Sequence, residues 1–240
     1  MDNRIPLVLL PGLLCDEALW KHQINELSDV ADCQVPDFTT QDTVAAMAHS
    51  VLDNMPGRFA LAALSMGGYV ALEVMRQASE RVSRLALLDT QPLRDTPEQA
   101  ERRRHFVQLA EQGDFDYVIE SFPPLLFHES RLADRALVSE FTAMAVKVGR
   151  QAFIRQQNAI ITRPDSSATL FTIGCPTLVA CGRQDAITPL ENSEKMAAEI
   201  PNSRLVIFED CGHMSTMEVP EQVNEALRDW LLAGSSVNRE

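Results

Sequence analysis

Basic residues are in short supply in this sequence of 240 residues. Lysine and arginine together number 21 against 34 aspartates and glutamates, so the formal net charge at pH 7 is −13 and the pI is near 4.8. Phosphate backbones and anionic lipid surfaces repel a chain with this charge. The composition therefore argues against nucleic acid and membrane surfaces as partners.

Cysteine pairs of the C-x-x-C type are missing. The five cysteines are widely spaced and odd in number: Cys15, Cys33, Cys175, Cys181 and Cys211. That pattern fits neither a zinc site nor a disulfide framework. We expect reduced thiols, no metal and a cytoplasmic location. The sequence also has no dinucleotide-binding fingerprint, so we expect no cofactor.

Long apolar runs are missing as well, since none approaches the roughly 18 residues that a membrane helix needs. The stretch IPLVLLPGLLC (5–15) looks like a short secretory signal, but Asp2 offsets Arg4, and Leu14 takes the place of a small residue before Cys15. We interpret residues 5–12 as a buried strand and expect no membrane segment.

What the sequence does contain is an alternation of β-rich runs with amphipathic runs of helical spacing. This alternation is typical of a parallel sheet covered by helices on both faces. It predicts an α/β fold of about six mostly parallel strands. The strands are expected at 5–12, near 32–37, and at 59–65, 81–90, 175–185 and 203–212. The helices are expected over 16–29 and 43–55, from 66 onward, near 190–200 and over 220–232.

The alternation stops between residues 93 and 171, where the pattern is helical throughout. The stretch PEQAERRRHFVQLAEQ opens with Pro97, a favourable first helical residue, and spaces Glu98 four residues before Arg102. We predict a helical cap over 93–171, inserted after the fourth strand of an α/β core formed by 1–92 and 172–240.

One serine stands at a junction in the stretch FALAALSMGGYVALEVM (59–75). Ser65 ends an apolar strand and is followed at once by residues of helical spacing. Such a strand-to-helix turn strains the serine and exposes its hydroxyl, and small neighbours such as Ala63 and Gly67 relieve the crowding. The pattern indicates a nucleophile. The alternative is a serine that caps the following helix.

A serine nucleophile needs a base, and the base needs an orienting carboxylate. Of the five histidines, His213 alone follows a late strand in a glycine-containing loop. Asp185 lies at a strand end between Ser65 and His213 in chain order, and we favour it as the carboxylate. Asp89 is the rival because its strand is expected next to that of Ser65.

Two backbone amides are candidates for stabilising an oxyanion. In LLPGLL, Gly12 allows the backbone to pass close to the serine, and the amide of Leu13 would point inward. The amide of Met66, directly after Ser65, is the expected second donor. An ordinary turn is the alternative for Pro11-Gly12.

Taken together, these stretches resemble the α/β-hydrolase superfamily over nearly the whole chain. The similarity rests on LLPGLL, ALSMGGYVALE, LVACGRQDAITP and FEDCGHMSTMEVPEQVNEALRDWL, and it is greatest to the small capped carboxylesterase, enol-lactonase and carrier-protein methyl esterase branch. The resemblance implies Ser65 as nucleophile, His213 as base and then acid, Asp185 as orienter, and an acyl-serine intermediate that water hydrolyses.

This resemblance implies a serine hydrolase that cleaves a small or medium carboxylic ester. A thioester, a lactone or a carbon-carbon bond would use the same triad and oxyanion site. A non-hydrolytic lyase or a ligand receptor on the same scaffold is a third alternative. Partners would then be a small ester or acyl substrate.

The cap supplies candidates for an apolar acyl pocket. They are Phe106, Phe115, Tyr117, Phe122, Phe127, Phe141 and Met144. The run Arg102–Arg104 suggests contact with an acidic partner such as an acyl carrier protein or a thioester. A solvated helix face is the alternative for this run.

Overall fold

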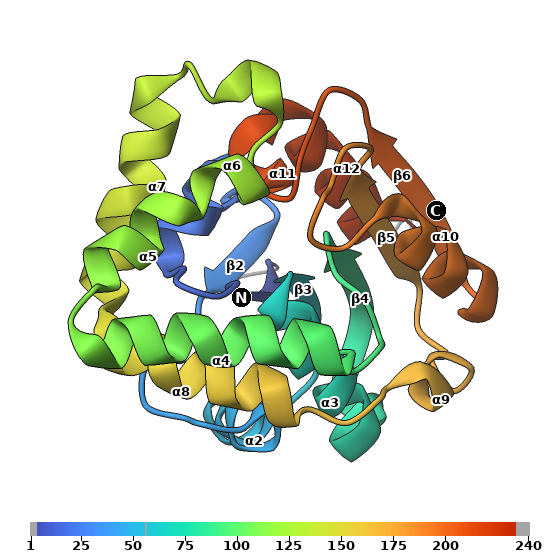
Figure 1. Ribbon diagram of the computed structural model, residues 1–240. Helices are drawn as coiled ribbons and strands as arrows, with labels where there is room; N and C mark the ends of the chain where they lie inside the picture. The colour runs from blue at the N-terminus through green and yellow to red at the C-terminus, as the bar shows by residue number, and fades with distance from the viewer. Residues whose placement is uncertain (1–3, 56, 234–240) are drawn as a thin grey trace, which may run out of the picture.

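The structure is a computed structural model that describes residues 4–55 and 57–233 (Figure 1). Six parallel strands form one sheet in the order β2-β1-β3-β4-β5-β6. The strands are β1 (Ile5–Leu10), β2 (Ala31–Gln34), β3 (Phe59–Leu64), β4 (Val82–Leu88), β5 (Thr177–Gly182) and β6 (Ser203–Phe208). The predicted α/β class with about six mostly parallel strands is confirmed.

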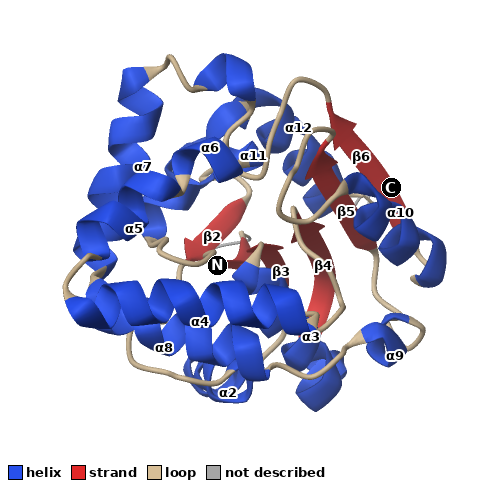
Figure 2. Cartoon of the chain, in the orientation of Figure 1, coloured by secondary structure: helices blue, strands red, loops and turns tan. Residues whose placement is uncertain are grey.

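Helices cover both faces of the sheet (Figure 2). On one face, an apolar cluster joins alternate strand residues such as Leu7 and Ala62 to α12 (Pro220–Leu232) and to Leu27, which follows α1 (Lys21–Glu26). On the other face, Val8 and Ala63 belong to a second cluster with α2 (Val44–Asn54), α3 (Met66–Ala78) and α10 (Leu190–Glu199). Because both faces are covered, every residue of β3 and β5 is buried.

The predicted helix over 16–29 is shorter and divided. Asp16 caps a 3₁₀ turn, Glu17–Trp20, by accepting a hydrogen bond from the amide of Ala18, and α1 follows. The amides of Val30 and Ala31 then bond back to the carbonyl of Leu27. This tight turn uses the residues that were expected to form the last helical turn.

Helices α4 to α9 lie between β4 and β5 in the chain, where the sequence pattern is helical. They are α4 (Pro97–Gln112), α5 (Phe115–Ser121), α6 (Pro123–Leu126), α7 (Arg135–Val148), α8 (Arg150–Thr162) and α9 (Ser167–Leu170), with a 3₁₀ turn at Glu129–Arg131. Their buried residues Phe141 and Phe153 belong to the same apolar cluster as the sheet residues Leu9 and Leu64. The insert therefore shares a core with the sheet, and its treatment as a separate cap domain over 93–171 stays a prediction.

The register of the sheet brings three strand ends to one edge. Leu64 of β3 lies beside Leu88 of β4, which lies beside Ala180 of β5. The ladder of hydrogen bonds continues past the strands, because the amide of Ser65 donates to the carbonyl of Leu88 (3.1 Å) and the amide of Asp89 donates to the carbonyl of Ala180 (2.9 Å).

Among the described residues, none of the helices is long and apolar enough to cross a membrane.

Candidate active site

Ser65 occupies a strained turn between β3 and α3. Its φ of 55° and ψ of −117° lie outside the regions that most residues with a side chain adopt. Glycines follow for a steric reason: a Cβ at Gly67 would collide with the backbone of Leu10, and one at Gly68 with the side chain of Thr90. Thr90 also donates a hydrogen bond to the carbonyl of Ser65 (2.8 Å). These contacts hold the turn rigidly.

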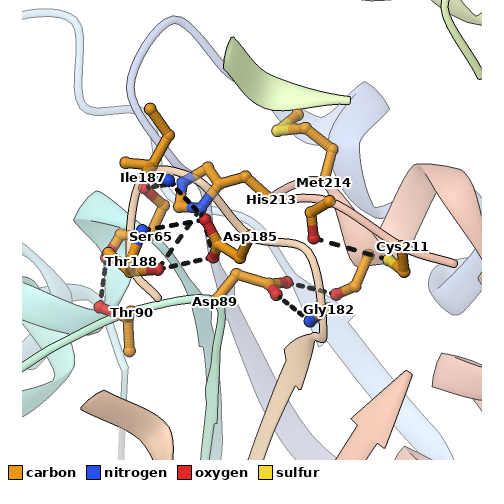
Figure 3. A network of polar contacts seen from close by, with 12 residues as sticks. Ser65, Asp89, Thr90, Gly182, Asp185, Ile187, Thr188, Cys211, His213 and Met214 are labelled. Carbon is orange, nitrogen blue, oxygen red and sulfur yellow. Dashed lines mark hydrogen bonds and ion pairs between the residues drawn. The ribbon is translucent and has the colours of Figure 1, made fainter. Parts of the chain in front are cut away.

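The side chain of Ser65 does not cap α3, which removes the capping alternative. Its Oγ lies 2.7 Å from Nε2 of His213 (Figure 3). On the other side of the ring, Nδ1 of His213 lies 2.7 Å from Oδ2 of Asp185. Because a carboxylate only accepts, Nδ1 carries the proton of the neutral ring and Nε2 is left to accept from Ser65.

Asp185 follows β5 and is held by four hydrogen bonds. Its Oδ1 accepts from the amides of Ile187 (2.8 Å) and Thr188 (2.9 Å), and its Oδ2 accepts from the Thr188 hydroxyl (2.7 Å) as well as from His213. Burial by itself raises the pKa of Asp185, but the charge of His213 and these hydrogen bonds outweigh it and lower that pKa. Asp185 is therefore ionised beside the imidazole.

His213 is buried, with 2% of its surface exposed. Burial alone lowers the pKa of its imidazole, whereas the charge of Asp185 and the hydrogen bond to it raise that pKa above its usual value. The effects that raise the pKa are the larger ones, so the imidazole of His213 is a stronger base than a histidine in water.

Asp89, the rival carboxylate, directly follows β4 and is completely buried. Its Oδ1 accepts from the amide of Gly182 (2.9 Å), and its Oδ2 accepts from the hydroxyl of Ser215. Burial and, after it, the charge of Asp185 raise the pKa of Asp89 to about 8. No hydrogen bond joins Asp89 to His213 within residues 4–55 and 57–233, so Asp185 is the carboxylate in contact with the ring.

The loop after β1 passes directly beside Ser65. A Cβ built on Gly12 would lie 3.5 Å from Cβ of Ser65, which is ordinary contact, so glycine is not needed there for close approach of the backbone. The absence of a side chain instead keeps the pocket open, because Gly12 lines it. Leu13 also lines this pocket, and within the described residues no hydrogen bond uses its amide.

Met66 is the first residue of α3, and its amide has no acceptor inside the helix. The amide of Leu13 belongs to the loop beside Ser65, and that of Met66 comes directly after Ser65 in the chain. The use of these two amides as oxyanion donors stays a prediction.

The pocket next to Ser65 is largely apolar and lies between the sheet edge and the insert. Two of the predicted aromatic residues, Phe106 and Phe122, line it together with Leu125 and Ile187. The structure places the other five predicted pocket residues elsewhere. Tyr117 is 62% exposed on α5, and Phe115 packs against the ring of Phe153. The remaining three are buried in the apolar core: Phe127, Phe141 and Met144.

Comparison with known proteins places this chain in one family. The model of the Alpha/beta hydrolase family matches residues 7–226. The chain belongs to that family. One similar protein is the pimeloyl-[acyl-carrier protein] methyl ester esterase of Nitrosomonas europaea, which is 28% identical over 92% of this chain and 93% of the relative.

Solved structures of α/β-hydrolases resemble this one closely. A thermophilic esterase from Thermogutta terrifontis, solved with malate bound, is 32% identical, with a TM-score of 0.86 over 95% of this chain and 89% of that one. The enol-lactonase of Burkholderia xenovorans has a TM-score of 0.88 over 95% and 92% of the two chains, but at 21% identity this likeness supports the fold alone.

Two buried residues of this α/β-hydrolase support the site and were not predicted from the sequence. Gln156 of α8 accepts from the amide of Leu14 (3.0 Å) and donates to the carbonyl of Phe38 (3.1 Å), so it fixes the loop that carries Leu13. Glu218 accepts from the amides of Gly212 (3.0 Å) and Met214 (3.2 Å), on either side of His213. No sequence motif marks Gln156. For Glu218, the available signal in the sequence was a glutamate five residues after His213.

Metal-ligating side chains and cysteine thiols are the other groups that could carry chemistry in this hydrolase. No group of three or more His, Cys, Asp or Glu side chains within residues 4–55 and 57–233 is arranged to hold a metal ion. Cys15 lines the pocket, but burial raises the pKa of its thiol, so it stays protonated and is a poor nucleophile.

Proposed function

We propose that this α/β-hydrolase cleaves small or medium carboxylic esters, with Ser65 as nucleophile, His213 as general base and Asp185 as the residue that orients the imidazole. The observation that carries the proposal is the unbroken contact from Ser65 Oγ to His213 Nε2 (2.7 Å) and from His213 Nδ1 to Asp185 Oδ2 (2.7 Å). The strained turn at Ser65 supports it, because it lifts the hydroxyl into the pocket.

In the first half of the reaction, Ser65 Oγ attacks the ester carbonyl carbon while His213 Nε2 takes the hydroxyl proton. The ring then carries a positive charge, which the ionised Asp185 stabilises. The raised pKa of His213 favours this proton transfer. The tetrahedral intermediate collapses when the alcohol leaves with the proton from His213, and an acyl-serine remains.

In the second half, water attacks the acyl-serine as His213 removes its proton. The carboxylic acid is released when the C–O bond to Ser65 breaks and the proton on His213 returns to Ser65 Oγ. Both tetrahedral intermediates carry an oxyanion, for which the amides of Leu13 and Met66 are the proposed donors. Loss of one such donor typically costs about 3 kcal/mol of transition-state stabilisation.

The triad does not distinguish an ester from a thioester, a lactone or a carbon-carbon bond, because the oxyanion chemistry is shared. A methyl ester carried by an acyl carrier protein is the second candidate, favoured by the name of the relative that aligns over 92% of this chain. The two candidates can be separated by comparing kcat/KM for a free small ester with kcat/KM for the same ester linked to a carrier protein.

A cytoplasmic location stays a prediction from the cysteine pattern.

The deciding experiment compares Ser65→Ala with the wild-type protein on short aryl acyl esters. We expect the variant to lose several orders of magnitude in kcat while its thermal unfolding temperature is retained. Ser28→Ala, at an exposed serine away from the pocket, is the matched control. A serine-directed phosphonate should label the wild type and the control but not Ser65→Ala. Wild-type turnover by Ser65→Ala would refute the assignment.

A further inference from the structure

Two arginines of α4, Arg102 and Arg103, line the same pocket as Ser65. No aspartate or glutamate is among the described residues that line it. This is unexpected in a chain with a net charge of −13. Positive charge is therefore concentrated at the place where the proposed substrate would bind.

Arg103 is held in a fixed position by two contacts. Its Nε lies 2.7 Å from Oδ2 of Asp95, and its Nη1 donates to Oε1 of Gln157 (3.1 Å), which also lines the pocket. Asp95 is shared, because Nη2 of the buried Arg163 lies 2.9 Å from its Oδ1. Two guanidinium groups thus share one carboxylate, and the cluster keeps a net positive charge.

Arg102 is exposed and lines the pocket, so it lies at the pocket mouth. Within residues 4–55 and 57–233 its guanidinium makes no ion pair or hydrogen bond. The third arginine of the run differs from both, because Arg104 pairs with Glu101 on the same helix (3.2 Å) and does not line the pocket. The helix thus directs two arginines to the pocket and one away from it.

We propose that this pocket selects esters that carry a carboxylate a few carbons from the ester carbonyl, with Arg102 and Arg103 as the residues that bind it. This inference rests on the proposed function of Ser65. A guanidinium matches a carboxylate because two parallel N–H groups meet its two oxygens. The apolar walls formed by Phe106, Phe122 and Leu125 would cover the carbon chain between the two ends.

The cost of dehydration favours a carboxylate over a more highly charged group such as a phosphate. Arg103 and Arg163 share the charge of Asp95, which leaves about one net positive charge in that cluster. Arg102 adds one more. In a pocket with apolar walls, each charge acts more strongly than on an open surface. A monoanionic group leaves about one positive charge in excess, but it avoids the larger dehydration cost of a dianion.

The test compares three proteins: the wild type, Arg102→Gln and Arg104→Gln. Each protein is assayed with two pairs of substrates. The first pair places the carboxylate on the acyl side: a monoaryl ester of glutaric acid against the aryl ester of pentanoic acid. The second pair places it on the alcohol side: the butyrate ester of a hydroxybenzoic acid against that of the corresponding cresol. For each pair, the ratio of kcat/KM for the anionic over the neutral ester is measured.

We expect wild-type protein to prefer the anionic member of one pair, and Arg102→Gln to lower that ratio about tenfold, the effect of losing one charge-assisted hydrogen bond. Arg102→Glu should lower it further. Arg104→Gln, the matched control, should leave both esters at the wild-type rate. The pair that responds shows which side of the ester carries the anion.

Equal ratios for wild type, Arg102→Gln and Arg102→Glu in both pairs would overturn this inference. Arg103→Lys, which keeps the charge beside Asp95 but loses the fork of N–H groups, gives a second measure, and its ratio should also fall. Failure of the wild-type protein to cleave any of the four esters would instead count against the proposed esterase function, so the two failures are distinguishable.

Discussion

The carboxylate of Glu218 accepts a hydrogen bond from the amide of His128 (2.8 Å) and so ties the insert to the loop of His213. Its other oxygen binds the amides of Gly212 and Met214. From the insert side, the carbonyl of Leu126 accepts from the amide of His213 itself (2.7 Å). The imidazole of His213 is therefore positioned jointly by the core and by the insert.

Replacement of Glu218 by Gln should lower both stability and activity. An amide group presents one acceptor and one donor, so at least one of the three N–H groups loses its buried partner, at a cost of about 1–3 kcal/mol. Urea unfolding and kcat/KM on a short aryl ester measure the two effects. Glu225→Gln, at an exposed position of α12, is the control. Unchanged kcat/KM in Glu218→Gln would mean that the loop of His213 does not depend on this carboxylate.

Asp185→Asn and Asp89→Asn should differ sharply in activity. In Asp185→Asn the neighbour of Nδ1 is no longer ionised, and kcat should fall by about three to four orders of magnitude. In Asp89→Asn the side chain stays neutral and close in shape to the protonated acid, so most of the activity at pH 7 should remain. Steady-state kinetics at pH 7 checks this. The reverse order of losses would transfer the orienting role to Asp89.

Asp89 should also make stability depend on pH. Its pKa is raised from 3.8 when the chain is unfolded to about 8 when folded, so the folded state holds the proton more tightly. The stability from this group is complete below about pH 4 and is lost as pH rises toward 8. Asp89→Asn removes the titration, so its free energy of unfolding relative to wild type should increase from pH 5 to pH 8. Chemical unfolding at several pH values measures the difference, and a constant difference would contradict the raised pKa.

Gln156→Ala should weaken catalysis more than substrate binding. Gln156 supports the loop of Leu13 through the amide of Leu14, and its loss frees the backbone whose amide is the proposed oxyanion donor. We expect kcat to fall about tenfold or more with a smaller change in KM. Gln151→Ala, at an exposed position of the same helix, is the control. A fall in stability with no change in kcat would leave Gln156 a structural residue only.

The sheet was predictable because most of its strands are largely apolar and alternate with helical patterns. The three triad candidates were found because each follows a strand end, where parallel strands place their side chains at one edge. The rival Asp89 meets the same criterion. The chain order favoured Asp185, but the sequence could not show which of the two carboxylates the loop of His213 reaches.

The pocket was harder to predict. Which side of an insert helix faces Ser65 depends on how α4 to α8 pack, and the apolar residues Phe106 and Tyr117 look alike in the sequence although one lines the pocket and the other is exposed. The same holds for Arg102 and Arg104. Gln156 acts through backbone groups far away in the chain, and no local pattern shows such contacts.

The close contact between Gly212 and the backbone of residues 126–128 sets a condition for building chimaeras of this fold. A Cβ at position 212 would collide with the carbonyl of Leu126 and the amide of His128. A transplanted helical segment that is meant to bring new substrate preference must therefore reproduce the backbone course of these few residues.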